Sequence, residues 1–264
     1  RRSGTHVSAA MNAPTEYLLH LADNALILGQ RNAEWCGHGP ILEEDIALSN
    51  NSLDLIGQAR MLYQHAATQI GNGATEDTLA YFRDVPDFRN YTLCELPHMP
   101  LMAATSKGDR DFAMTIVRNF LYSSLMVLVW DQLQASKDTQ LAAIAAKSLK
   151  EVRYHLRHSR DWLLRLGDGT DASHAKAQAA LDQLLPYCQE FWTTSPQEAA
   201  ALANGTGTDM ATQARQKLSQ QTHHVSEVAQ HYIQDKPFKS VMLAAGTGAA
   251  VALAMDWWLR ARKH

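Results

Sequence analysis

Residues 137–167, KDTQLAAIAAKSLKEVRYHLRHSRDWLLRLG, form the longest uninterrupted helical pattern in this 264-residue chain. Apolar and small side chains recur along it at alternating steps of four and three, which places them on one face of a helix. That face consists of Leu141, Ala145, Ser148, Val152, His155, Ser159, Trp162 and Leu166. Glu151, Tyr154 and His155 lie near the centre of the stretch, so the same residues raise the question of a metal site.

The segments around this stretch also favour helices and give no strand-like alternation. Apolar periodicity predicts helices over residues 15–36, 42–70, 110–135, 137–166 and 172–192, with a bend expected at Pro186. Three prolines between residues 78 and 109 exclude one long helix there. We therefore predict an all-α bundle of antiparallel helices over residues 11–195.

One helix of this bundle should be fully buried. Residues 120–130, FLYSSLMVLVW, are uncharged and apolar on nearly all sides, which is typical of a central core helix. Eleven residues are too few to span a bilayer, which needs about 20.

Composition limits the classes of function. The net charge of −3 gives no reason to expect a nucleic-acid partner. Three scattered cysteines without a CxxC pair indicate reduced thiols in the cytoplasm rather than a disulfide framework. Residues 1–10 are small and polar, and we interpret them as a leader or a cloning remnant.

The C-terminal part has a different composition. Residues 196–209 are predicted to be a linker, and residues 210–264 a helical tail. Within the tail, residues 241–259 are apolar except for Asp256, which suits a membrane anchor. Its anchor residues would be Gly246, Gly248, Trp257, Trp258 and Arg260. The alternative is an Ala- and Gly-rich helix packed on the bundle.

The bundle lacks the pattern of a carboxylate-bridged di-iron site, which takes a single Glu from each of two helices and Glu-x-x-His from each of two others. Gly57 follows Asp54 at the His position, and Tyr154 follows Glu151. The buried helix has no acidic residue between Asp111 and Asp131. The first helix offers Asp23 or Glu34 as alternatives.

We therefore predict no metal and no catalytic residues in this chain, with Asp54, Glu151 and His155 as vestigial ligand positions. Glu151 and His155 are separated by four residues and would share one side of their helix. We expect them to form a buried hydrogen-bonded pair, with Asp54 or Arg60 as a further partner.

Residues 15–192 resemble the PaaC subunits of bacterial ring-1,2-phenylacetyl-CoA epoxidases. The matching stretches are LADNALILGQRNAEWCGHGP (21–40), EEDIALSNNSLDLIGQAR (43–60), EDTLAYFRD (76–84) and DTQLAAIAAKSLKEVRYHLRHSRDWLLRLGDGTD (138–171). This resemblance implies a ferritin-like bundle without a cofactor of its own. The partner would be a homologous di-iron catalytic subunit that epoxidises the ring of phenylacetyl-CoA.

The tail departs from that family and instead is similar to ElaB-type inner-membrane anchor proteins, through HYIQDKPFKSVMLAAGTGAAVALAMDWWLRARK (231–263). Three hypotheses follow for the function. The first is a non-catalytic structural subunit of a phenylacetyl-CoA epoxidase in a hetero-oligomer. The others are a stand-alone di-iron enzyme that uses Asp54, Glu151 and His155, and a membrane-tethered helical scaffold without an oxygenase role.

Overall fold

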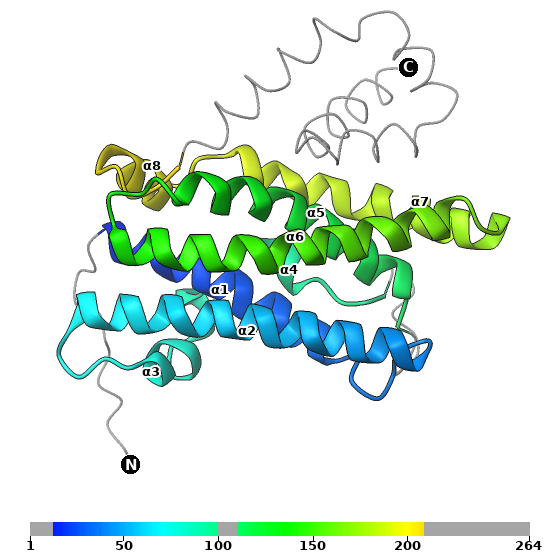
Figure 1. Cartoon of the computed structure of the whole chain (residues 1–264), viewed down its shortest axis with the longest axis horizontal. Helices are drawn as coiled ribbons and strands as arrows, with labels where there is room; N and C mark the ends of the chain where they lie inside the picture. The colour runs from blue at the N-terminus through cyan, green and yellow to red at the C-terminus, as the bar shows by residue number, and fades with distance from the viewer. Residues whose placement is uncertain (1–12, 100–109, 209–264) are drawn as a thin grey trace, which may run out of the picture.

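The computed structural model describes residues 13–99 and 110–208, and every regular element within these ranges is a helix. Four long helices form the bundle: α1 (Ala13–Ala33), α2 (Leu42–Ile70), α5 (Phe112–Leu133) and α6 (Thr139–Gly167). α1 packs along α2 and α5 packs along α6, as two hairpins (Figure 1). α2 and α6 also touch each other on the face seen in Figure 1. The predicted all-α bundle is confirmed.

α5 lies at the centre of the bundle, as the sequence predicts. Nearly all of its side chains are buried, and α6 and α7 (Asp171–Leu184) both pack against it. Within the described ranges, α5 is the helix whose length and hydropathy would suit a membrane span. Because most of that span lies inside the protein, burial in the core accounts for its apolar character.

Shorter elements connect and cover the long helices. α3 (Glu76–Tyr81), the 3₁₀ turn η1 (Val85–Asp87) and α4 (Thr92–Glu95) cross from α2 towards α5, where the prolines exclude a long helix. α7 continues into the 3₁₀ segment η2 (Leu185–Trp192), so the α-helical hydrogen bonding ends just before Pro186.

Polar side chains fix the helix ends. Asp111, Asp138 and Thr170 accept a hydrogen bond from a backbone N–H in the first turn of α5, α6 and α7, respectively. Gly71 ends α2 with a φ of 67°, a conformation that side chains disfavour and glycine adopts freely.

The structure differs from the sequence prediction after residue 195. α8 (Pro196–Ala203) begins where a linker was expected, and it packs on α1. Ser195 caps it through a reciprocal pair with Glu198, Pro196 suits its first turn, and Ala201 is fully buried. The predicted leader (1–10) and the predicted anchor (241–259), with its five named residues, lie outside the described residues.

Candidate functional site

A row of polar contacts joins α2 to α6. His155 Nε2 lies 3.0 Å from Asp54 Oδ2, Gln58 Nε2 donates to Glu151 Oε2 over 2.9 Å, and His158 Nε2 lies 2.8 Å from Glu44 Oε2. Each contact crosses between the same two helices at a different level. Together they form an interhelical seam, because buried or half-buried charged groups need partners.

The three predicted ligand positions all lie in this seam, yet they do not converge on one point. The predicted Glu151–His155 pair is wrong: Glu151 binds Gln58 and approaches Lys147 instead. His155 binds Asp54, which was expected as a further partner. Arg60, the alternative partner, pairs with Glu76 of α3 instead. The seam therefore consists of separate pairs.

The two acidic candidates of the first predicted helix, Asp23 and Glu34, also have partners away from the bundle centre. Asp23 is fully buried and accepts hydrogen bonds from the Tyr63 hydroxyl, the Arg83 guanidinium and the Arg89 backbone N–H. Glu34, in the turn just after α1, pairs with Arg31 and lies 3.5 Å from His98 Nε2. Neither carboxylate lines the bundle centre.

The bundle centre holds a small cavity of about 10 Å³. Each of the four long helices contributes to its lining: Leu28 and Asn32 from α1, Asn51 and Leu55 from α2, Asn119, Tyr122 and Ser123 from α5, and His155 from α6. Sequence reasoning missed the three asparagines, although their positions match the di-iron pattern closely. Asn32 and Asn119 stand alone on α1 and α5, while Asn51 precedes Asp54 by three residues and Val152 precedes His155 by three.

These residues do not fit a di-iron centre. Iron in such bundles is bridged by carboxylates, and the inward positions here hold neutral amides and a valine. Asp54, which is not part of the lining, is engaged by the lining residue His155. Within the described ranges, no three His, Cys, Asp or Glu side chains are grouped as metal ligands would be. We therefore derive no iron chemistry for this chain.

A second buried polar cluster lies where α5 meets the segment after α4. Arg118 is almost completely buried and donates to the Leu96 carbonyl and, over 2.9 Å, to His98 Nδ1. His98 Nε2 lies 2.7 Å from the Arg31 carbonyl, so the Nε2–H tautomer satisfies both contacts. Burial, and then the Arg118 charge, lowers the pKa of His98 to about 3. Burial also lowers the pKa of Arg118 to about 10.

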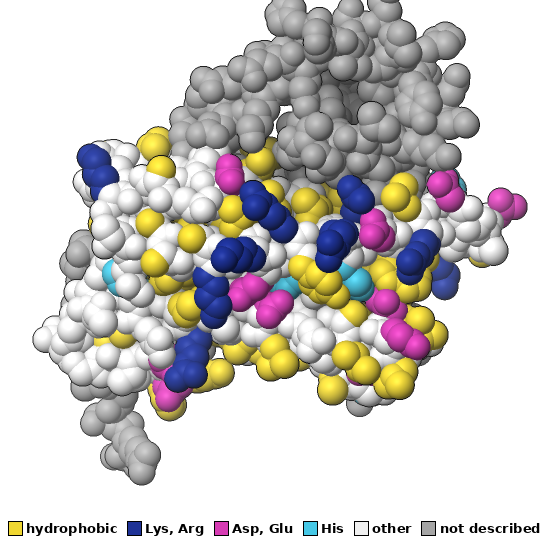
Figure 2. Space-filling model, viewed as in Figure 1, with side chains coloured by type: hydrophobic (Ala, Val, Ile, Leu, Met, Phe, Trp, Pro, Cys, Tyr) yellow, Lys and Arg dark blue, Asp and Glu magenta, His cyan; other side chains and the backbone are white. Residues whose placement is uncertain are grey.

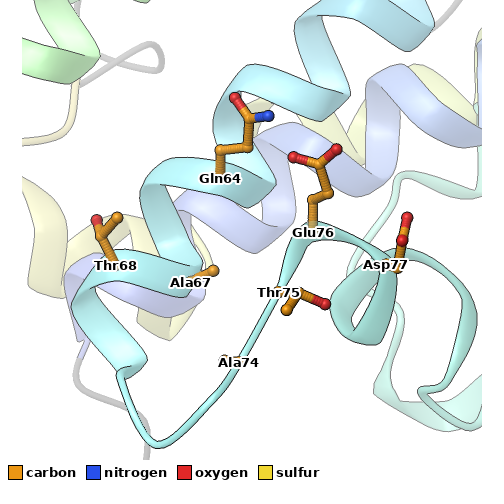
Figure 3. A pocket seen from close by; sticks show the side chains of 7 residues that line it. All are labelled: Gln64, Ala67, Thr68, Ala74, Thr75, Glu76 and Asp77. Carbon is orange, nitrogen blue, oxygen red and sulfur yellow. The ribbon is translucent and has the colours of Figure 1, made fainter.

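An open hollow of about 470 Å³ lies beside the C-terminal half of α2. Figure 3 shows its lining, which comes from Gln64, Ala67 and Thr68 of α2 and from residues 74–77. Its Glu76 is paired with Arg60, and its Thr75 caps α3. The hollow thus combines helix-capping groups with small side chains, and its lining includes no nucleophile paired with a base.

Comparison with known proteins settles the family. Residues 3–241 match the family model described as phenylacetic acid catabolic protein. The chain belongs to the phenylacetic acid catabolic protein family. It is also 45% identical over 202 residues to the C subunit of the 1,2-phenylacetyl-CoA epoxidase of Escherichia coli strain K12, covering 76% of this chain and 77% of that protein.

The sequence motifs resemble the family over residues 15–192, and the match to the family model extends beyond this range at both ends. It includes most of the predicted leader and all of residues 196–240, which the sequence assigned to a linker and to a tail unlike the family. The family therefore covers more of this chain than residues 15–192.

Proposed function

We propose that this chain is a non-catalytic, structural subunit of a phenylacetyl-CoA epoxidase that serves aerobic phenylacetate degradation. The observation that supports the structural role is the bundle centre, where Asn32, Asn51 and Asn119 stand at positions that need carboxylates to bind iron. Its 45% identity to the C subunit of the Escherichia coli epoxidase supports the assignment to that complex.

In this proposal the chain contains no cofactor, and a homologous catalytic subunit holds the di-iron centre. The chain braces that subunit through helix packing. The seam between α2 and α6, with its three polar contacts, keeps the supporting face in one arrangement.

The surface of α2 suits such a partner. Leu42, Ile46 and Leu53 are 71%, 51% and 67% exposed, and their spacing places them on one side of the helix. A Cβ added to Gly57, four residues further on, would meet no atom within 4 Å, so this side is also open to close approach. We call these four residues the α2 outer face.

The α2 outer face lies beside a basic row on α6. Figure 2 shows hydrophobic side chains along α2 and dark blue basic ones along α6 on the same face of the molecule. The exposed basic residues of α6 are Lys147, Lys150, Arg153, Arg157 and Arg165. A partner with an apolar helix face and an acidic flank would complement both features.

The test uses the full chain and its catalytic partner, each purified separately. Alone, the chain should retain no stoichiometric redox-active iron and should not epoxidise phenylacetyl-CoA. Mixed with the catalytic subunit, it should co-elute with that subunit and support turnover when a reductase is supplied. Stoichiometric redox-active iron in the isolated chain, or no binding to the catalytic subunit, would refute the proposal.

A further inference from the structure

The central cavity contains polar groups that the fold leaves without partners. Asn32 Oδ1 and Nδ2, Asn51 Oδ1 and Asn119 Oδ1 and Nδ2 are buried and make no hydrogen bond within the described residues. The three side chains are 1%, 2% and 3% exposed and line the same cavity from three helices. A buried polar group without a partner is unfavourable, so five such atoms on three residues that line one cavity indicate a ligand.

We infer that this cavity is a binding site for one buried water molecule, held by the amides of Asn32, Asn51 and Asn119. The volume of about 10 Å³ is close to the minimum for a single water. Water both donates and accepts hydrogen bonds, which matches amides that present oxygen acceptors and N–H donors.

The chemistry of the lining excludes charged ligands. Its only titratable side chains are Tyr122 and His155, and His155 Nε2 is engaged by Asp54. A divalent cation prefers carboxylate or imidazole ligands and would have no carboxylate in this lining to balance its charge. A buried anion would likewise meet no Lys or Arg side chain in the lining. The water replaces a metal ion as the group that links α1, α2 and α5.

A crystal structure of the full chain, grown with ferrous iron, tests this inference directly. We expect one peak of density at about 2.7–3.1 Å from the amide atoms, without anomalous signal at the iron edge. A peak at about 2.0–2.2 Å with anomalous signal would mean a metal site. Direct bonds among the three amides, with no peak between them, would overturn the inference as well.

A matched pair of variants provides an independent test in solution. Asn51→Leu replaces one amide by an apolar side chain of similar size, and Asn50→Leu makes the same change at its exposed neighbour. Water-relaxation dispersion should count one fewer long-lived internal water in Asn51→Leu and no change in Asn50→Leu. An unchanged count of internal waters in folded Asn51→Leu would contradict the inference. If Asn51→Leu does not fold, Asn119→Leu provides the same test.

Discussion

At the scale of single residues, Asp23 connects α1 to the segment after α3. Its carboxylate is fully buried and accepts from Tyr63, from two Arg83 nitrogens and from the Arg89 backbone N–H. The Arg83 guanidinium also lies 4.3 Å from the centre of the Phe88 ring. Burial and the neighbouring Asp23 charge raise the pKa of Tyr63, so its hydroxyl stays protonated and keeps donating.

Asp23→Ala should lower the free energy of unfolding by about 3–5 kcal/mol, because it leaves the Arg83 charge buried without its anion. Tyr63→Phe should cost only about 1 kcal/mol, because it removes one hydrogen bond. Urea unfolding followed by circular dichroism measures both. Arg60→Ala, which breaks an exposed pair, is the control and should change stability by less than about 1 kcal/mol. An Asp23→Ala effect as small as that of the control would contradict this role.

His98 makes stability depend on pH. Its pKa is about 3 in the folded protein and about 6.5 in the unfolded chain, so unfolding takes up a proton below pH 6.5. Neutral His98 makes its full contribution to the free energy of unfolding above pH 6.5, and this contribution declines as pH falls towards 3. The decline has a slope of up to about 1.4 kcal/mol per pH unit.

His98→Gln should therefore flatten the pH dependence of stability between pH 6.5 and 4.5. Urea unfolding of both proteins at several pH values gives the slope of the unfolding free energy against pH for each. The wild-type slope should be steeper by up to about 1.4 kcal/mol per pH unit, which corresponds to the uptake of one proton. Parallel curves for the two proteins would show that His98 is already charged in the folded state.

At the scale of elements, the start of α6 is joined to the end of α2. Asp138 caps α6 by accepting from the Leu141 N–H, and its other carboxylate oxygen lies 2.6 Å from His65 Nε2 on α2. Burial opposes the ionisation of Asp138. The Leu141 and His65 contacts outweigh that effect and lower the pKa of Asp138 below 3.8.

Asp138→Ala should lower the free energy of unfolding by about 1–2 kcal/mol at pH 7, because it removes both the cap and the contact with His65. Asp138→Asn keeps a capping oxygen and should cost less. A depressed carboxyl pKa stabilises the fold above the unfolded value and ceases to do so as pH falls through the folded value. The gap between wild type and Asp138→Asn should therefore begin to narrow below about pH 4 and close only as pH falls through the lower pKa of the folded state. A gap that does not narrow as pH falls would contradict a charge effect.

At the scale of the whole molecule, the exposed apolar side chains of α2 and the basic row of α6 share one face (Figure 2). Leu53→Glu would place an unpaired charge at the centre of the proposed contact. It should weaken binding to the catalytic subunit at least tenfold, which corresponds to about 1.4 kcal/mol. Calorimetric titration measures the Kd.

Leu202→Glu on α8 is the matched control, because Leu202 is 40% exposed and Figure 1 shows α8 on the opposite side of the bundle from α2. It should leave the Kd unchanged. Equal weakening by both variants, or none by Leu53→Glu, would place the interface elsewhere.

The apolar run at residues 241–259, which the structure does not describe, gives a prediction about location. If the run anchors the protein, removal of residues 241–264 should transfer the chain from the membrane fraction to the supernatant. Quantitative blotting after fractionation measures the partition. Leu53→Glu, made in the full chain, should not alter it, and an unchanged partition after the deletion would exclude the anchor.

Sequence patterns predicted much of the architecture. The bounds of α2 and the burial of α5 agree with the expected 42–70 helix and with the uncharged run at 120–130. α8 was missed because its short Ala-rich run resembles a linker, although Ser195 and Glu198 form a recognisable capping pair. The di-iron pattern is defined by carboxylates, so it does not point to Asn51, which precedes Asp54 by the three residues that the pattern requires.

The sequence alone determined where the long helices lie, which of them is central and that this helix has no acid between Asp111 and Asp131. Only the tertiary structure decided that Asn32, Asn51 and Asn119 meet at one cavity and that Asp54 faces His155. Helical periodicity fixes the direction of each side chain relative to its own helix axis. The rotation and stagger of one helix against another depend on how side chains from distant parts of the chain pack together.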